Sequence, residues 1–440
     1  MKQRLLLALL TFALAACAPL QPQKPSAEKR YDAAELLALQ PAAFIWPAMS
    51  QEGERLLREQ VLADIRARIA LPPGPERDAA LPRLFDMVAQ YNAEIDAARP
   101  LLLEALPTLG GRDPEFQRAL LTAAHTLYAA ESERAVWALL PELKASKPFA
   151  IAAYTLLKAR PDNARLIVDL VPGQFPQWRD DPRLVALMDA VAPVRMGQPP
   201  LPELLAAPLR PGLPAIYSLQ RRGREQMGLV LVRGADGRFV RDSAGQLFAQ
   251  PQLALSRSGL PGTITNGNTP QGLFAIVGAG TATNPNIGPT PYLHSKLPVE
   301  ATVAEFEHAE SGAAVEWSEA AYESFLPAAW RTYSGIKEAW LAGRAGRDEL
   351  LVHGTTINPA YYAGTSYFPG TPQQGCMISN EDWDPATGRL LASRQLTLAQ
   401  AYAAASTRSD LAGYLVVVEV EGQGPVTLAE VRALVDAAGR

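Results

Sequence analysis

The chain has 440 residues, which exceeds the length that one hydrophobic core usually supports, so two or more domains are expected. With 48% hydrophobic and 20% charged residues, the composition is that of a soluble globular protein and excludes a disordered or fibrous chain. The formal net charge is -4, and no lysine and arginine cluster is interleaved with aromatic residues, which excludes nucleic acid as a partner.

Residues 1–17 have the pattern of an export signal. A positively charged start and an apolar stretch from Leu5 to Ala13 precede the tetrapeptide Leu14-Ala15-Ala16-Cys17. This tetrapeptide resembles the bacterial lipobox, which implies lipidation of Cys17 and attachment to a membrane. A simple secretory signal cleaved nearby is the alternative, and both export the chain to the cell envelope. Ala18 is not the aspartate that retains lipoproteins at the inner membrane of enteric bacteria, which favours the outer membrane.

Residues 18–30 are polar and contain three prolines, as expected of a tether that holds a folded domain away from a lipid surface. Lipidation of Cys17 would leave Cys376 as the one thiol of the mature protein, so no intramolecular disulfide is expected. In an oxidising periplasm a lone thiol is either buried and inert or retained for its reactivity.

Residues 31–193 are rich in alanine and leucine and predict a helical domain. Phe116, Leu120, Ala124 and Leu127 recur at the spacing of one helix face. Aspartate followed by proline predicts two helix starts, at Asp113-Pro114 and Asp181-Pro182. Paired antiparallel helices or a short α-solenoid would fit this pattern, although no clean repeat period is present.

Seven prolines between Pro193 and Pro214 end the helical pattern, so residues 194–212 are expected to be a linker. Residues 213–424 then predict a mainly β domain, and residues 425–440 a C-terminal helix, giving an α+β multidomain chain. Capping boxes predict helices that begin at Thr397 and at Thr427. Strands are expected at Leu229–Val232 and Arg238–Arg241, which form a hairpin, and at Leu273–Val277, Leu350–His353 and Tyr414–Val420.

Cys376 and His353 are the residues that suit nucleophilic chemistry. Gly375 precedes the cysteine and lets a substrate approach the backbone closely, whereas His353 ends an apolar strand pattern. A cysteine attacks as its thiolate, and a neighbouring imidazole lowers the thiol pKa and can return the proton to a leaving amine. The alternative is structural: a histidine at the end of a strand and a small buried cysteine.

Three segments together resemble the catalytic domain of the L,D-transpeptidases, which cross-link peptidoglycan. They occur in the family's order, and the resemblance covers roughly residues 213–422 and leaves the helical half unexplained. The three are Asn268-Thr269-Pro270-Gln271-Gly272-Leu273-Phe274, Val352-His353-Gly354-Thr355 and Gly375-Cys376-Met377. The resemblance implies a β-fold, no cofactor, Cys376 as nucleophile, His353 as base and the carbonyl of Gly354 as the group that orients the imidazole.

Two positions depart from the family pattern. The family usually has serine or threonine two residues before the glycine and arginine or asparagine shortly after the cysteine, whereas this chain has Gln373 and Ile378. The local hydrogen-bond network must therefore differ.

The stretch between His353 and Cys376 also looks longer than usual. It carries Tyr361, Tyr362 and Tyr367. With Thr355, these aromatic residues are candidates for binding substrate, and loop packing is their structural alternative.

The other histidines have no partner spacing. His294 is expected to be a solvated loop residue. With one cysteine in the predicted mature chain and no paired histidine motif, a zinc site is not expected. The sequence thus predicts an acyl-enzyme on Cys376 and transfer of a peptidoglycan stem peptide to an amine. An L,D-carboxypeptidase or endopeptidase using the same thioester is one alternative. The other is a non-catalytic peptidoglycan-binding lipoprotein whose helical domain binds a protein partner.

Overall fold

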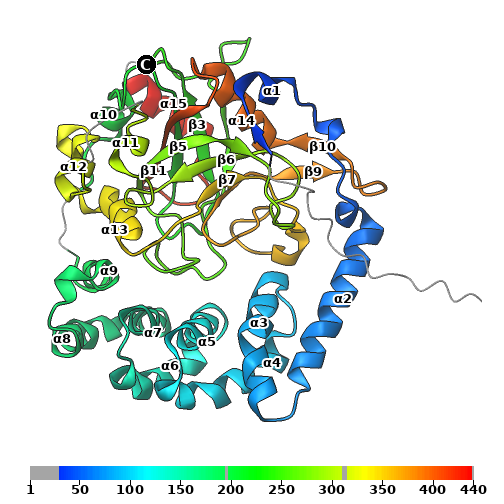
Figure 1. Cartoon of the computed structure of the whole chain (residues 1–440), viewed down its shortest axis with the longest axis vertical. Helices are drawn as coiled ribbons and strands as arrows, with labels where there is room; N and C mark the ends of the chain where they lie inside the picture. The colour runs from blue at the N-terminus through cyan, green and yellow to red at the C-terminus, as the bar shows by residue number, and fades with distance from the viewer. Residues whose placement is uncertain (1–28, 194–196, 310–314, 439–440) are drawn as a thin grey trace, which may run out of the picture.

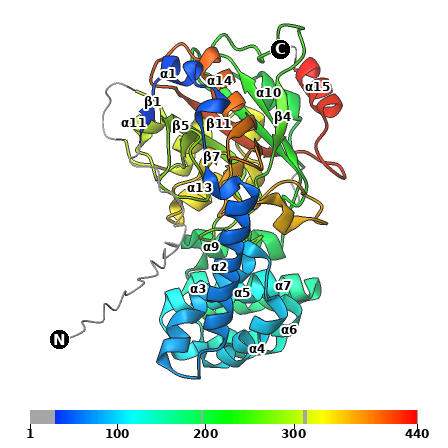
Figure 2. The same cartoon turned by 90° about the vertical axis from the view of Figure 1, so that its right-hand side faces the viewer.

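The computed structural model describes residues 29–193, 197–309 and 315–438. The predicted signal peptide with Cys17 and nearly all of the predicted tether lie outside these ranges. The described residues form an α+β protein in two parts, a helical region and a mostly β region with a nearly closed sheet (Figure 1). Figure 2 shows α2 (Gln51–Ile69) running from the β half into the helical half.

The helical half is built from successive short helices. Contacts join α3 to α5, α5 to α7 and α7 to α9, so alternate helices lie side by side in one layer. Both predicted starts are confirmed, because Asp113 and Asp181 cap α5 and α9 with proline in the first turn. After α2 the helices are α3 (Pro75–Tyr91), α4 (Ile95–Ala105), α5 (Pro114–Leu127), α6 (Ala129–Leu139), α7 (Ser146–Ala159), α8 (Ala164–Gln174) and α9 (Pro182–Val191).

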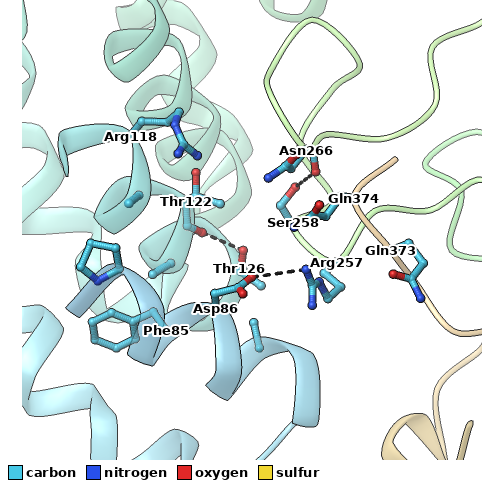
Figure 3. A pocket seen from close by; sticks show the side chains of 14 residues that line it. Phe85, Asp86, Arg118, Thr122, Thr126, Arg257, Ser258, Asn266, Gln373 and Gln374 are labelled. Carbon is cyan, nitrogen blue, oxygen red and sulfur yellow. Dashed lines mark hydrogen bonds and ion pairs between the residues drawn. The ribbon is translucent and has the colours of Figure 1, made fainter. Parts of the chain in front are cut away.

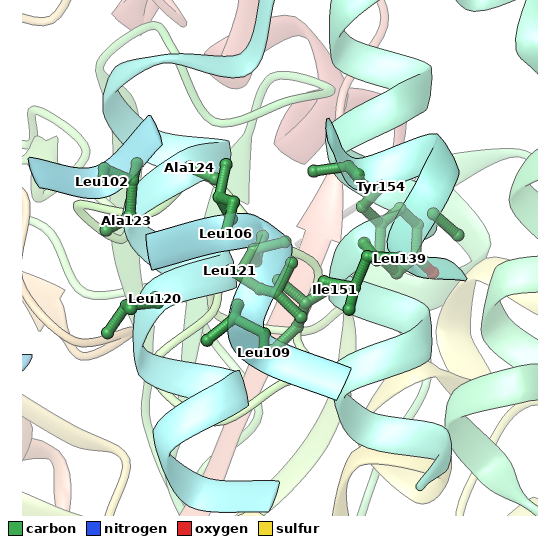
Figure 4. Packing of buried hydrophobic residues seen from close by; sticks show 14 of the residues in the cluster. Leu102, Leu106, Leu109, Leu120, Leu121, Ala123, Ala124, Leu139, Ile151 and Tyr154 are labelled. Atoms are coloured by element: carbon green, nitrogen blue, oxygen red, sulfur yellow. The ribbon is translucent and has the colours of Figure 1, made fainter. Parts of the chain in front are cut away.

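Leucine and alanine side chains form the core of this half (Figure 4). Helix α7 lies at its centre, with every residue from Pro148 to Leu156 buried. Ala150, Ala152 and Ala153 in this stretch are small enough to let α5 and α6 approach closely. The many alanine and leucine residues of this half therefore allow neighbouring helices to pack closely.

The segment before α2 packs with the β half, which differs from the expected start of the helical domain at residue 31. β1 (Arg30–Tyr31) pairs with β5 (Gly272–Gly280), and α1 (Ala33–Ala38) packs on α14 (Arg394–Ala405). Leu36 of α1 is buried in the apolar core of the sheet. The chain thus completes part of the β half before α2 enters the helical half.

The sheet of the β half has the strand order β4-β3-β2-β11-β5-β6-β7-β8, with β1 also paired to β5. Its central strand β11 lies parallel to β2 and antiparallel to β5 and is buried along nearly its whole length. The strands are β2 (Ala215–Gln220), β3 (Gly228–Arg233), β4 (Ala249–Gln252), β5 (Gly272–Gly280), β6 (Tyr292–Lys296), β7 (Leu351–His353), β8 (Met377–Ile378) and β11 (Ala412–Glu419). A separate ribbon pairs β9 (Glu381–Trp383) with β10 (Leu390–Ser393).

The two ends of the large sheet meet just beyond β4. Leu253 exchanges two backbone hydrogen bonds with Ile378 of β8, at 2.9 and 2.8 Å. Arg257 N–H also donates to the carbonyl of Gln373 at 2.8 Å. The sheet is therefore nearly closed, and the segment that carries Cys376 lies at the seam.

Four of the five predicted strands are confirmed, and Arg238–Arg241 instead continues the hairpin through isolated bridges. The helix predicted at Thr427 is confirmed as α15 (Leu428–Ala437), with a complete capping box. The start predicted at Thr397 is wrong, because Ser393 caps α14 (Arg394–Ala405) and Thr397 lies inside it. The remaining helices of this half are α10 (Leu201–Ala206), α11 (Val303–Phe306), α12 (Glu319–Ser324) and α13 (Glu338–Arg344).

The two halves are joined by apolar and polar contacts. The loop between β4 and β5 buries Leu260 and Ile264 in the core of the helical half. Arg257 on the same loop donates to Gln90 at 2.5 Å and to Asp86 at 3.3 Å, both on α3. The expected linker also carries structure, because Leu204 of α10 is buried in the core of the β half. No helix among the described residues is long and apolar enough to cross a membrane.

Candidate active site

The segment before Cys376 has a backbone that only glycine adopts easily. Gly375 has φ +102°, and a Cβ at this position would lie 2.0 Å from Nη2 of Arg347 and 2.2 Å from the carbonyl oxygen of Gly267. The carbonyl of Gly375 accepts a hydrogen bond of 2.7 Å from Thr269 Oγ1. Close packing on both sides therefore fixes the chain direction as it enters Cys376.

Cys376 immediately precedes β8 and is partly buried. Its Sγ accepts from the N–H of Leu351 at 3.4 Å and faces the carbonyl of Glu349 at 3.8 Å. Burial raises the pKa of the thiol, whereas the Leu351 N–H and the charge of Arg347 act in the opposite direction. The resting group is therefore the neutral thiol.

His353 ends β7 and is almost completely buried. Its Nδ1 bonds to the carbonyl of Gly354, which can only accept, so the proton is on Nδ1 and the lone pair is on Nε2. Burial lowers the pKa of His353 to about 4. At neutral pH the imidazole is therefore an uncharged base with its tautomer set by Gly354, the residue that the resemblance implied for this role.

The β7–β8 pairing relates Cys376 to His353. Val352 lies opposite Met377 in this parallel pair, and both are buried in the apolar core of the sheet. Since side chains alternate along a strand, Cys376 and His353 belong to the other face. No hydrogen bond joins the two side chains in the described structure.

The sequence-based expectation of a thiol activated at rest by histidine therefore differs from this geometry. The thiol of Cys376, directly before β8, and the imidazole of His353, on the neighbouring β7, are both neutral, so attack by this thiol would require transfer of its proton to a base. Catalytic hydrogen bonds are often long without substrate and tighten when it binds, so this geometry does not exclude the pair.

His294 is not the loop residue that was expected. It lies in β6, where it pairs with Leu351 of β7, and it is partly buried. Its ring meets that of Tyr292 edge-on at 6.1 Å. Since paired residues on neighbouring strands share a face, His294 lies on the face of Leu351 and His353, and the sequence signal for this was the alternation of Tyr292, His294 and Lys296.

Arg347 is a residue of the site that sequence reasoning missed. Its buried guanidinium bonds only to backbone carbonyls, those of Gly262, Ile264, Gly267 and Gln374. No carboxylate pairs with it in the described structure, and burial lowers its pKa to about 10. Arg347 thus brings a buried positive charge without an ion pair to the segment before Cys376, although the charge of Asp348 also acts on it. Nothing in the sequence distinguished it from a surface arginine.

Gln373, where the family pattern has serine or threonine, takes part in a buried hydrogen-bond network. Gln373 is buried, and its Nε2 donates to Oγ1 of Thr355 at 3.3 Å, as does the hydroxyl of Thr371 at 3.1 Å. Thr355 Oγ1 also accepts from the N–H of Ile357 at 3.1 Å. Thr355 therefore links the histidine loop to the segment before the cysteine, and its predicted contact with substrate stays a prediction.

The tyrosines between His353 and Cys376 pack at the junction of the two halves. Tyr361 is bonded through its hydroxyl to Glu54 of α2 and lies 5.4 Å from the ring of Tyr91 on α3. Tyr362 donates to the carbonyl of Gln90 at 2.9 Å, and Tyr367 lies 6.1 Å from its ring. These contacts give the tyrosines a role in joining the halves, and a contact with substrate stays a prediction.

Glu381 lies behind the histidine loop. A Cβ on Gly354 would meet its carboxyl carbon at 2.4 Å, and Ser393 donates to its Oε1 at 2.7 Å. Its Oε2 is shielded from solvent and has no hydrogen-bond partner among the described residues. Burial raises the pKa of Glu381 to about 7, so this carboxyl is protonated in part at neutral pH.

No group of three or more histidine, cysteine, aspartate or glutamate residues is arranged to hold a metal within the described ranges. The fold and the site define a two-part α+β protein with a cysteine and a histidine on adjacent strands. No protein-family model, no curated protein and no solved structure matches the chain.

Proposed function

We propose that this protein is an envelope acyltransferase with the chemistry and fold type of the L,D-transpeptidases, acting on peptidoglycan stem peptides. The observation that carries the proposal is that the three motif segments, which are far apart in the sequence, contact one another in the fold. Thr269 of the first binds the carbonyl of Gly375 across 106 positions, and β7, which carries His353, pairs with β8 directly after Cys376. Motifs that matched only by chance would have no reason to converge at one seam.

In the proposed reaction, Cys376 Sγ attacks the carbonyl carbon between an L-centre and a D-residue of the donor stem. The thiol proton passes to Nε2 of His353, which is free because Nδ1 is bonded to Gly354. Backbone N–H groups near Gly375 and Cys376 are the proposed donors to the tetrahedral oxyanion. Collapse transfers the proton from His353 to the departing amine and leaves a thioester.

An amine of a second stem then attacks the thioester. His353 takes a proton from this amine, the new amide forms, and the thiol of Cys376 is restored as it regains a proton. Attack by water in place of the amine would give the carboxypeptidase or endopeptidase alternative. The neutral thiol without a hydrogen bond to histidine favours a second candidate of another class, a non-catalytic peptidoglycan-binding lipoprotein.

Incubation of the protein with purified muropeptides, followed by mass spectrometry, separates these candidates. Cross-linked dimers support transpeptidation, trimmed stems support hydrolysis, and unchanged muropeptides support the binding protein. A Cys376→Ser variant is the control, because it keeps the size of the side chain and should lose either activity. A carbapenem resembles the D-acyl substrate and should add its mass to Cys376 only if the thiol is catalytic.

A further inference from the structure

A cavity of about 230 Å³, lined by both polar and apolar side chains, lies where the two halves meet, beside the segment that leads to Cys376 (Figure 3). Helices α3 and α5 form one wall, and the loop between β4 and β5 forms the other with Gln373 and Gln374. Small-molecule sites usually enclose roughly 300 to 1,000 Å³, so this cavity has room for part of a ligand. Gln374 is two residues from Cys376, which limits their Cα separation to about 7.6 Å.

The cavity offers donors that the protein itself does not use. Arg118 of α5 bonds through Nε to Glu115 at 2.6 Å, and its two terminal nitrogens have no partner among the described residues. Thr122, one turn further along α5, has a buried hydroxyl without a hydrogen-bond partner. Buried polar groups are normally bonded, so an orphan that lines a cavity points to a missing partner, either water or a ligand.

Charge in the cavity favours an anion. Arg118 and Arg257 line it against one carboxylate, Asp86, which is already bonded to Arg257 and to Arg83. Guanidinium groups bind carboxylates with two parallel hydrogen bonds. The lining also has apolar surface that suits a small aliphatic side chain, from Pro82, Phe85, Ala89, Ala119 and Ala123.

We infer that this cavity is a subsite for the carboxylate end of a short peptide that carries a small apolar terminal residue. The helical half would thereby supply one wall of the substrate site, with Arg118 as the carboxylate ligand and Thr122 as a second donor. The choice of peptide rests on the proposed function, because a stem peptide ends in such a residue. The carboxylate preference rests on the cavity alone.

The test is binding by calorimetry to the full chain carrying Cys376→Ser, so that the ligand is not consumed. The probe is a stem-type peptide ending in D-alanine whose terminal carboxylate is its only one, compared with its C-terminal amide. We expect Arg118→Met to raise the Kd of the peptide acid about tenfold or more, and Thr122→Val to raise it a few-fold. The parent should bind the C-terminal amide as weakly as the Arg118→Met variant binds the acid. Arg165→Met is the matched control, because Arg165 is an exposed arginine of α8 that forms no ion pair with the described residues, and it should leave the Kd unchanged.

Absence of binding at millimolar peptide, equal Kd values for Arg118→Met and the parent, or equal Kd values for acid and amide would each overturn the subsite. The ion pair of Arg118 is at the surface, so loss of folding is not expected, and Ala119→Leu offers a second variant that fills the cavity without changing charge. Ala119→Leu should also weaken binding. Failure of the subsite is distinct from failure of the proposed function, because the muropeptide assay on the unmutated chain reports turnover independently of this binding.

Discussion

Nη2 of Arg347 donates a hydrogen bond of 2.9 Å to the carbonyl of Gln374, two residues before Cys376. The same guanidinium bonds to the carbonyl of Gly267 at 2.8 Å. One buried side chain therefore fixes both the loop that fills the junction of the halves and the approach to the cysteine. No carboxylate forms an ion pair with this guanidinium in the described structure, and its charge also acts on the thiol.

Arg347→Met should destabilise the protein by about 3 kcal/mol, because several buried carbonyls lose their donor. It should also raise the pH at which Cys376 reacts with iodoacetamide, since the cation favours the thiolate. Arg347→Lys keeps the charge and should retain most of the effect on the thiol while losing stability. Urea unfolding and the pH profile of alkylation measure the two effects. An unchanged profile in Arg347→Met would rule out electrostatic action on the thiol.

The thiol of Cys376 should react slowly with iodoacetamide at neutral pH, with a midpoint above the value of about 8.5 for free cysteine. His353→Ala should leave the rate of this resting reaction within about twofold, because no hydrogen bond joins the two side chains. The same variant should abolish muropeptide turnover. The urea-unfolded chain supplies the reference midpoint. A midpoint below neutrality that rises in His353→Ala would instead support a histidine-activated thiolate.

Glu381 should make stability fall as pH rises from about 4.5 to 7, because its pKa in the folded state is raised to about 7. In that window the folded state binds more protons than the unfolded chain, so the contribution is complete at low pH and is lost above the folded pKa. Glu381→Gln cannot titrate and should be more stable than the parent by about 1 to 3 kcal/mol at pH 8. Urea unfolding at pH 4.5 and 8 measures this difference. Glu76→Gln, at an exposed glutamate of α3, is the control and should keep the pH dependence of the parent, because Glu381 is unchanged in it.

Tyr362→Phe should loosen the junction of the two halves, because it removes the 2.9 Å hydrogen bond to the carbonyl of Gln90. The expected cost is about 1 kcal/mol, with faster hydrogen exchange in α3 and in residues 357–368. Tyr154→Phe is the matched control, since Tyr154 is a buried tyrosine whose hydroxyl has no hydrogen-bond partner among the described residues. Equal effects of the two variants would show that the hydroxyl of Tyr362 does not hold the junction.

Cys17→Ser should yield a precursor that carries no lipid, as the lipobox resemblance implies. Metabolic labelling with a fatty acid, together with mass spectrometry of the mature N-terminus, measures this outcome. The Cys376→Ser variant should be labelled as the parent is. An unmodified mature N-terminus at another residue would remove the predicted membrane anchor.

Local sequence patterns correctly predicted helix starts and strands that depend on residues close together in the chain. Asp113-Pro114 and Thr427 with Glu430 began helices as predicted, because a cap depends on residues within one turn. The continuous apolar run around Val416 became the buried central strand for a similar reason. At Thr397 the same pattern failed, since Ser393 offered a competing cap four residues earlier.

Long-range packing decided what lies around the cysteine. The sequence motifs pointed to Cys376 and His353. The strand pairing that places them on one face, the buried charge of Arg347 and the cavity lined by Arg118 all depend on segments far apart in the chain. Residues 29–49 likewise carry no local signal that assigns them to the β half, because β1 and α1 acquire partners only in the folded protein. Local patterns determine the helix caps and the strands. The burial of Cys376 and His353, their pKa values and their placement on one face follow from tertiary contacts, which residue spacing in a single sequence does not reveal.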